Sequence, residues 1–362
     1  MFLGLDILQE SSYGNTMLVE GFGKEYEPGM EGMMEIMLEN AQDAHDLDMA
    51  VTLTSVKKSQ LLMEGKSYEA EMLQENVFKN VYAKMKELFK KMWARMKDFF
   101  KSVRLYFDKW ALNSKKFVEK YKDLINEAGS GTVEGYDYDI DAITVSGAWG
   151  KMKSELDKVK SSIASNTTGI ANVDVAEVKD NVSREIVGKD ASEFKKGVQA
   201  KLGITTVKKT IKYDASKLIS LLSSGMEPAN EIKKDEQGID KAYNTAIKEV
   251  EEAEKAQKDN VSAATKLSNN EKMTDDIRER ATKTKVNSSA RATDYNKLLD
   301  AYKQCLDMIN SITGLRTGAL KAQLKQAQSA AYAGIAKHRK ETKKERLGES
   351  TGVAGIYGDL IG

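Results

Sequence analysis

Few residues in this chain have the types and spacing that catalysis or metal binding would need. The two histidines, His45 and His338, and the single cysteine, Cys305, are far apart in the sequence. No Cys, Asp or Glu stands at ligand spacing from either histidine in a way that singles out a metal site. We therefore expect solvated histidines, a small core cysteine and no metal.

Catalytic motifs are missing as well. The chain has no Gly-rich phosphate loop ending in Lys-Ser/Thr, no dinucleotide fingerprint after a strand and no nucleophile elbow. Paired carboxylates such as Glu251-Glu252 occur within charged helix faces, where a solvated surface is the usual role. The sequence therefore predicts a protein that is not an enzyme and needs no cofactor.

The segment with the strongest chemical character is Val77–Trp110, where large apolar residues recur every three to four positions and basic residues fill the gaps. This spacing predicts an amphipathic helix. It has three interpretations, ranked in this order: a core helix with solvated lysines, an interfacial helix on anionic lipid, and a contact with nucleic-acid phosphates. The candidate partner or lipid contacts are the large stripe residues and nearby cations Phe89, Met92, Trp93, Phe99, Phe100, Trp110, Lys90, Lys91, Arg95 and Lys97.

The composition indicates the kind of scaffold that carries this segment. The 362 residues include only two prolines, Pro28 and Pro228, and are 31% charged and 41% hydrophobic. Such a chain favours long helices. We expect a mostly α fold of long amphipathic helices and antiparallel helical hairpins, with a small α+β unit in the middle. We expect neither a secretory signal nor a membrane span, because no run of about 18 apolar residues occurs.

Charge is distributed unevenly, although the formal net charge is only +1. Residues 1–50 are strongly acidic, with Lys24 as their only lysine, whereas residues 79–104 are strongly basic. The two regions could pair within the chain or between subunits, or the basic face could meet phosphates of lipid or nucleic acid. We favour the pairing.

Periodicity and glycine punctuation divide the chain into five parts. These are an acidic arm (1–30), a Met-rich helix plus a long basic aromatic helix (31–128), a small α+β unit (129–235), a polar helical hairpin or bundle (236–345) and a Gly-rich tail (346–362).

The finer boundaries follow from individual residues. Gly65 predicts a break, after which a long helix runs from Ser67 to Glu127 and ends at Gly129-Ser130-Gly131. β-branched residues predict strands over Tyr138–Val145 and Thr205–Tyr213. Breaks are expected at Asn269-Asn270 and at Gly314 in the last helical region.

The order of these features resembles structural or internal virion proteins of large contractile-tailed bacteriophages. The resemblance rests on the acidic arm and on the basic aromatic segment VYAKMKELFKKMWARMKDFFKSV, and it covers mainly residues 1–127. It implies a virion protein made in the host cytoplasm, with other virion proteins or copies of itself as partners.

A second pattern is similar to the sites cut by maturation proteases of T-even-like phage heads, which cleave after Glu in a Leu/Ile-x-Glu context before a small residue. The candidate processing sites are Glu20, Glu64 and Glu127, followed by Gly21, Gly65 and Ala128. The resemblance thus implies that cleavage is one fate of the chain.

Three functions remain open from the sequence. The first is a non-enzymatic structural component of a phage particle that assembles as a homo-oligomer or with other virion proteins. The second is a membrane-active protein that uses residues 67–127 on anionic lipid. The third is an internal scaffold or DNA-associated head protein, which the near-zero net charge makes less favourable.

Overall fold

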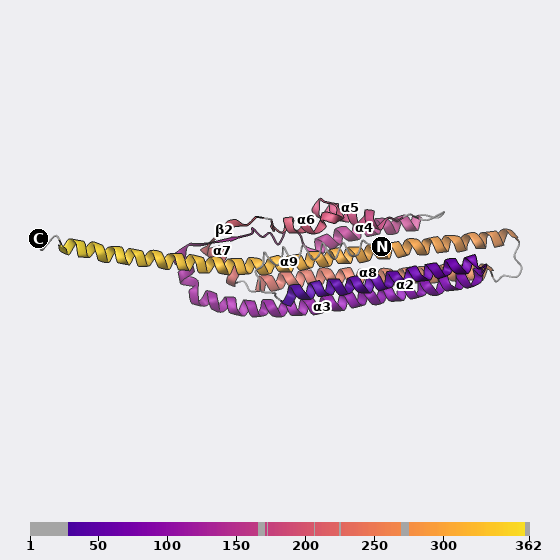
Figure 1. The fold of residues 1–362 in the computed structure, drawn as a ribbon, viewed down its shortest axis with the longest axis horizontal. Helices are drawn as coiled ribbons and strands as arrows, with labels where there is room; N and C mark the ends of the chain where they lie inside the picture. Colours follow the sequence, from indigo (N-terminus) through magenta and orange to yellow (C-terminus); the bar gives the residue numbers. More distant parts are fainter. Residues whose placement is uncertain are drawn as a thin grey trace. The chain divides into compact units, whose positions relative to one another are not determined.

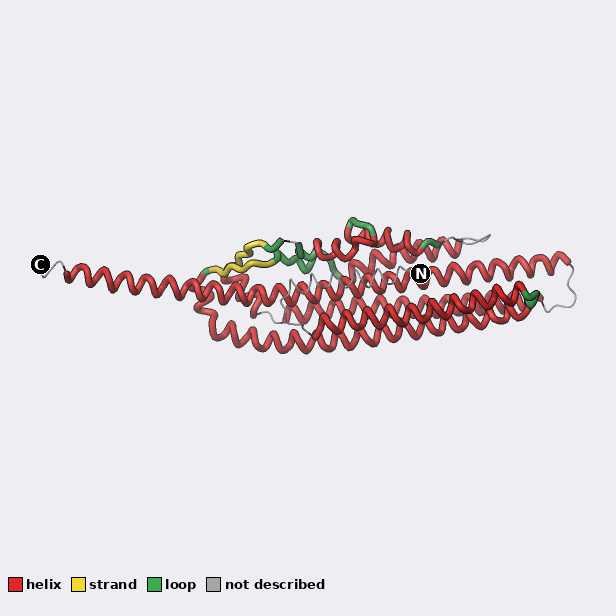
Figure 2. The backbone as a smooth tube through the Cα atoms, viewed as in Figure 1, coloured by secondary structure: helices red, strands yellow, loops and turns green. Residues whose placement is uncertain are grey.

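The computed structural model describes residues 28–165, 171, 173–205, 207–223, 226–268 and 275–358. Helices account for most of these residues, and two short strands form the one sheet in the described part (Figure 2). The predicted fold class is confirmed: the protein is mostly α, with a small mixed region in the middle of the chain. The predicted acidic arm lies outside the described residues, except for positions 28–30, which begin the first described helix.

The first helical hairpin consists of α2 (Pro28–Met63) and α3 (Ser67–Ala128) (Figure 1). Pro28 suits the first position of a helix, because the backbone N–H that proline lacks would have no partner within the helix there. Gly65 lies between the helices with a φ of 73°. At the other end of α3, Gly129 adopts a φ of 69° and donates its N–H to the Ile125 carbonyl at 3.2 Å. Glycine accepts this left-handed conformation without steric cost, so the predicted helix ends hold.

The second hairpin consists of α8 (Met226–Ser268) and α9 (Asp275–Gly358). The predicted break at Gly314 is wrong, because α9 passes through it. A glycine inside a helix costs only about 1 kcal/mol, and the neighbouring Ile312 and Leu315 are buried. Packing therefore outweighs the low helix propensity. Helix α9 also continues through the predicted tail as far as Gly358.

Between the hairpins, the described part of residues 145–201 contains four shorter helical segments. They are α4 (Val145–Ser165), α5 (Val175–Val187), the 3₁₀ turn η1 (Ala191–Glu193) and α6 (Phe194–Lys201). Asp174 caps α5, its carboxylate accepting the N–H groups of Ala176 at 2.9 Å and Glu177 at 3.3 Å. Such a cap satisfies donors that have no partner inside the helix.

The sheet pairs β1 (Ser130–Gly135) antiparallel with β2 (Lys209–Asp214), and α7 (Ala215–Ser223) follows directly. The strand predicted over Thr205–Tyr213 is therefore present from Lys209 onward, whereas the sequence predicts no strand over β1. The strand predicted over Tyr138–Val145 is wrong.

Local side-chain caps explain that error. The Asp139 carboxylate accepts the Ala142 N–H at 3.1 Å, and the Thr144 hydroxyl oxygen accepts the Gly147 N–H at 3.2 Å. These bonds form a turn and the start of α4, and they compete with strand pairing. The β-branched residues Ile140, Ile143 and Val145 are buried there without forming a strand.

The chain forms two compact units, each built from three separate stretches. Unit 1 is Met1–Ser102, Ile143–Val198 and Lys234–Gly314; unit 2 is Val103–Ala142, Gln199–Lys233 and Leu315–Gly362. Helices α3 and α9 each contribute residues to both units.

The core of unit 1 joins α3, α4, α8 and α9. Trp93 of α3 stacks on Tyr243 of α8 with ring centroids 5.6 Å apart, and Trp149 of α4 lies 6.5 Å from Tyr302 of α9. The buried Tyr243 hydroxyl accepts a hydrogen bond of 2.8 Å from the Asn310 side chain of α9. Large aromatic side chains thus hold together helices that are distant in sequence.

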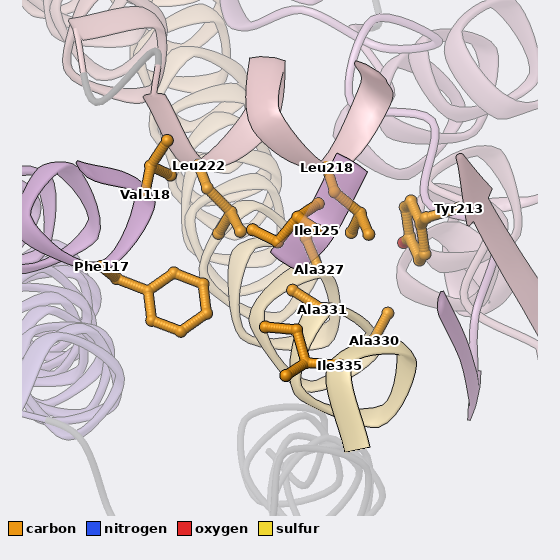
Figure 3. Close-up of a cluster of buried hydrophobic side chains, with 10 residues drawn as sticks. All are labelled: Phe117, Val118, Ile125, Tyr213, Leu218, Leu222, Ala327, Ala330, Ala331 and Ile335. Atoms are coloured by element: carbon orange, nitrogen blue, oxygen red, sulfur yellow. The ribbon is translucent and has the colours of Figure 1, made fainter. Parts of the chain in front are cut away.

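The core of unit 2 joins α3, β2, α7 and α9. Figure 3 shows how side chains from these elements converge on small residues of α9. The cluster comprises Phe117, Val118, Ile125, Tyr213, Leu218, Leu222, Ala327, Ala330, Ala331 and Ile335. The alanines let neighbouring backbones approach α9 closely: a Cβ at Gly131 of β1 would lie 1.9 Å from the Ala330 carbonyl oxygen.

Candidate interaction surface

The aromatic stripe of α3 fills the core of unit 1. Phe89, Met92 and Phe100 are completely buried, and Trp93 and Phe99 are nearly so. This arrangement corresponds to the core interpretation of the segment. In this structure these five side chains have no surface to offer a partner or a lipid layer, because the chain's own helices cover them.

Trp110 belongs to unit 2 and differs from the other five. It is half-buried and packs against the cluster of Figure 3. Its contacts there are also within the chain.

Three of the four candidate cations lie on the exposed side of α3. Lys90, Lys91 and Lys97 are exposed; Lys91 lies 3.4 Å from Glu87, and the Lys97 ammonium lies 4.7 Å above the Trp93 ring. An exposed pair of this kind contributes about 0.3–0.5 kcal/mol. These lysines are available to an external anion.

Arg95 instead joins the two helices of the first hairpin. Its guanidinium lies 2.6 Å from the Glu39 carboxylate and 2.8 Å from the Asp43 carboxylate, and it donates to the Asn40 side-chain oxygen at 2.8 Å. The acidic early region and the basic helix therefore pair within one chain at this point. A guanidinium with several acceptors fixes geometry better than an ammonium would.

Helix α2 has a second apolar face that points away from this contact. Ile36, Ala44 and Leu47 are buried, whereas Leu53 is 66% and Met63 80% exposed. The exposed face, which we name the α2 stripe, consists of Leu38, Gln42, His45, Met49, Leu53, Val56, Gln60 and Met63. At 100° per residue these positions fall within an arc of about 80°. The stripe contains no Asp, Glu, Lys or Arg.

Sequence analysis missed this surface. The sequence predicts a Met-rich helix here, but apolar residues on both sides of α2 blur a single helical period. The signal for the α2 stripe is a second set of apolar positions at helical spacing, half a turn away from the buried set.

Charge changes sign along the same helix. All its acidic residues lie at or before Asp48, and its lysines, Lys57 and Lys58, lie near its end. Asp46 and Lys57 are both exposed and flank the α2 stripe on the same side, since they fall about 20° apart around the helix. The stripe is thus edged by negative charge at one end and positive charge at the other.

Buried polar groups of α9 hold the loop after β1 within unit 2. The Gln326 side-chain oxygen accepts the Tyr136 N–H at 3.0 Å, and its amide nitrogen donates to the Tyr136 carbonyl and the Tyr213 hydroxyl, both at 2.8 Å. The buried Arg316 donates to the Ile140 carbonyl and lies 3.2 Å from the Glu231 carboxylate. These contacts satisfy backbone groups and position the loop.

The two histidines and the cysteine are dispersed over the structure. His45 is exposed on α2, and His338 lies 3.3 Å from the Glu127 carboxylate in unit 2. Burial raises the pKa of the Cys305 thiol to about 12, which keeps it protonated and unreactive. Among the described residues, no group of three His, Cys, Asp or Glu side chains could hold a metal ion.

The candidate processing sites lie at helix ends where described. Glu64 is exposed between α2 and α3, and Glu127 is exposed in the last turn of α3, whereas Glu20 lies outside the described residues. Within the described part of the chain, no helix has the length and apolar character needed to cross a membrane.

Comparison with known proteins adds no further constraint: no family model, no curated protein and no solved structure matches this chain.

Proposed function

We propose that this protein is a non-enzymatic structural component of a tailed-phage virion, which assembles through exposed helical surfaces with copies of itself or with other virion proteins. The observation that carries the assembly role is the α2 stripe. Apolar side chains aligned on a solvent-facing helix and edged by charge are characteristic of protein interfaces. The phage assignment rests on the sequence resemblance of residues 1–127.

A membrane-active protein is the second candidate, because residues 67–127 combine exposed lysines with a large aromatic stripe. This role requires α3 to leave unit 1. Each fully buried side chain, such as Phe89, Met92 or Phe100, would then lose about 1.5–3 kcal/mol of burial until lipid replaced it. The intrachain Arg95 contacts with Glu39 and Asp43 would also break.

An internal scaffold or DNA-associated protein is the third candidate. Its support is the exposed basic side of α3, with Lys90 and Lys97. Contacts of this type would neutralise phosphates without reading sequence, so binding would weaken steeply as salt increases.

Peptide and intact mass spectrometry of particles purified from the suspected source tests the proposal. We expect the protein to be present at a fixed copy number relative to other virion proteins after a wash in high salt. A full-length chain in the particles would indicate an uncleaved structural protein. A new N-terminus at Gly21, Gly65 or Ala128 would indicate that the protein belongs to a head matured by a protease. Absence would contradict the virion role.

Two binding assays separate the alternatives. Flotation with anionic vesicles at low salt supports the membrane role if the protein floats. Retention on DNA that falls with salt supports the nucleic-acid role. We expect neither for a protein that works through protein contacts alone.

A further inference from the structure

We propose that the α2 stripe binds the α2 stripe of a second copy of this chain, with the two helices antiparallel. This inference rests on the proposed assembly role and names the partner. It concerns Leu38, Met49, Leu53, Val56 and Met63, all at least half exposed, and the three polar residues between them.

The length and spacing of the stripe suit pairing with another helix. From Leu38 to Met63 the stripe positions are separated by three or four residues throughout. The stripe covers roughly three and a half heptads, which meets the length at which a coiled-coil seam becomes significant. A helix of the same kind offers it a matching apolar surface along its whole length, about 37 Å at 1.5 Å per residue.

Charge selects the second copy and the antiparallel direction. When the full stripe overlaps with itself, Leu38 lies opposite Met63 of the partner copy. Asp46 then lies opposite position 55, about 3 Å along the axis from Lys57. Two-fold symmetry places equivalent flanks on the same side, so Asp46 of each copy faces Lys57 of the other.

Parallel pairing loses this charge relation. The two-fold axis then runs along the helices and places the flank that holds Asp46 and Lys57 on opposite sides of the pair in the two copies, so these residues no longer face each other. Opposite charges at flanking positions of paired helices set orientation and partner choice. The acidic start and basic end of α2 therefore match an inverted copy of the same helix.

Cysteine cross-linking of the full-length chain tests the pairing directly. In a Cys305→Ala background, Leu38→Cys and Met63→Cys variants are prepared separately and then mixed under mild oxidation. We expect a disulfide linking position 38 to position 63 in the mixture. Each variant alone should give none, because its two cysteines would be about 37 Å apart in the antiparallel dimer.

The control for random collision is Ala94→Cys, which introduces an exposed cysteine on α3. Self-linked Leu38→Cys and self-linked Met63→Cys dimers would indicate parallel pairing and overturn the proposal. Absence of any link above the Ala94→Cys level, with a monomer in sedimentation equilibrium, would also overturn it. The latter result is expected if residues 1–27 of the same chain, or a different protein, occupy the stripe.

A charge exchange gives a second, independent readout. Asp46→Lys or Lys57→Asp alone should raise the dimer dissociation constant about tenfold, because each creates two like-charge contacts per dimer. The double variant Asp46→Lys/Lys57→Asp should restore the wild-type value. Failure of the double variant to recover would contradict the antiparallel contact.

The two proposals fail in different ways. A monomeric protein that is present in particles would remove the self-pairing and leave the structural role. A dimer with the 38–63 link that is absent from particles would remove the virion role and leave the self-pairing.

Discussion

At the scale of single residues, Asp307 of α9 shows how burial changes a charged group in unit 1. Its side chain is partly buried, and loss of hydration raises its pKa from the ordinary 3.8 to about 6. Nearby Lys303 and Lys179 oppose this shift, whereas Asp300 adds to it. Desolvation is the largest cause, so the folded state favours the protonated acid.

We predict that this carboxyl makes the protein less stable as pH rises. The folded pKa lies above the unfolded pKa, so the group's favourable contribution is complete below about pH 4 and is lost as the pH rises to 6. Replacing Asp307 with Asn removes the ionisation. The stability of Asp307→Asn relative to wild type should therefore increase by about 1–2 kcal/mol between pH 4.5 and 7.5.

Urea denaturation of both proteins at the two pH values measures this difference. Other titrating groups act equally on both proteins and cancel in the comparison. A difference that stays constant with pH would show that Asp307 is not desolvated as described.

At the scale of secondary-structure elements, unit 2 depends on the close approach of β1 to α9. A Cβ at Gly131 would lie 1.9 Å from the Ala330 carbonyl oxygen, and one at Gly334 would lie 2.6 Å from the Ser130 carbonyl oxygen. Both obstacles are backbone atoms, which cannot rotate away. The strand and helix must therefore separate if either glycine gains a side chain.

We predict that Gly131→Ala lowers the free energy of unfolding by about 1–3 kcal/mol, the usual cost of an overpacked contact. Gly150→Ala is the matched control, because its Cβ would meet no atom within 4 Å on the exposed side of α4. Alanine is the better helix former, so the control should be neutral or up to about 1 kcal/mol more stable. Equal stabilities of the two variants in urea denaturation would contradict the close contact.

Helix boundaries were the part of the fold that local sequence could predict. The long helix α3 was expected over Ser67–Glu127, because Gly65 and Gly129 mark its ends and its apolar residues keep one period. The helix break predicted at Gly314 is wrong, because the burial of its neighbours against other helices outweighs its low helix propensity. The strand predicted over Tyr138–Val145 is wrong too, because caps from Asp139 and Thr144 outweigh β propensity.

The candidate site was harder to predict for a physical reason. An apolar stripe has the same spacing whether it meets its own chain or a partner, so Phe89 and Phe100 could not be assigned from spacing alone. Their burial depends on contacts distant in sequence, such as that of Trp93 with Tyr243. The α2 stripe became visible only when the opposite side of that helix proved to be buried.

At the scale of the whole molecule, the chain forms two compact units. Each unit gathers three separate stretches, and α3 and α9 supply residues to both. Within unit 1 the large aromatic side chains of α3 are used internally, whereas the exposed apolar residues of α2 stay on the surface. We therefore attribute core stability to α3 and the proposed assembly role to α2.

The most direct test of this assignment is the copy number per particle of a Leu53→Lys/Val56→Lys variant, measured by quantitative mass spectrometry of purified particles. Both side chains are exposed in the single chain, so the variant should fold like wild type yet be lost from particles. The control is Ala94→Lys/Ser102→Lys, which adds the same charge at exposed positions of α3 and should be incorporated normally. Incorporation of the α2 variant at the wild-type copy number would contradict the account.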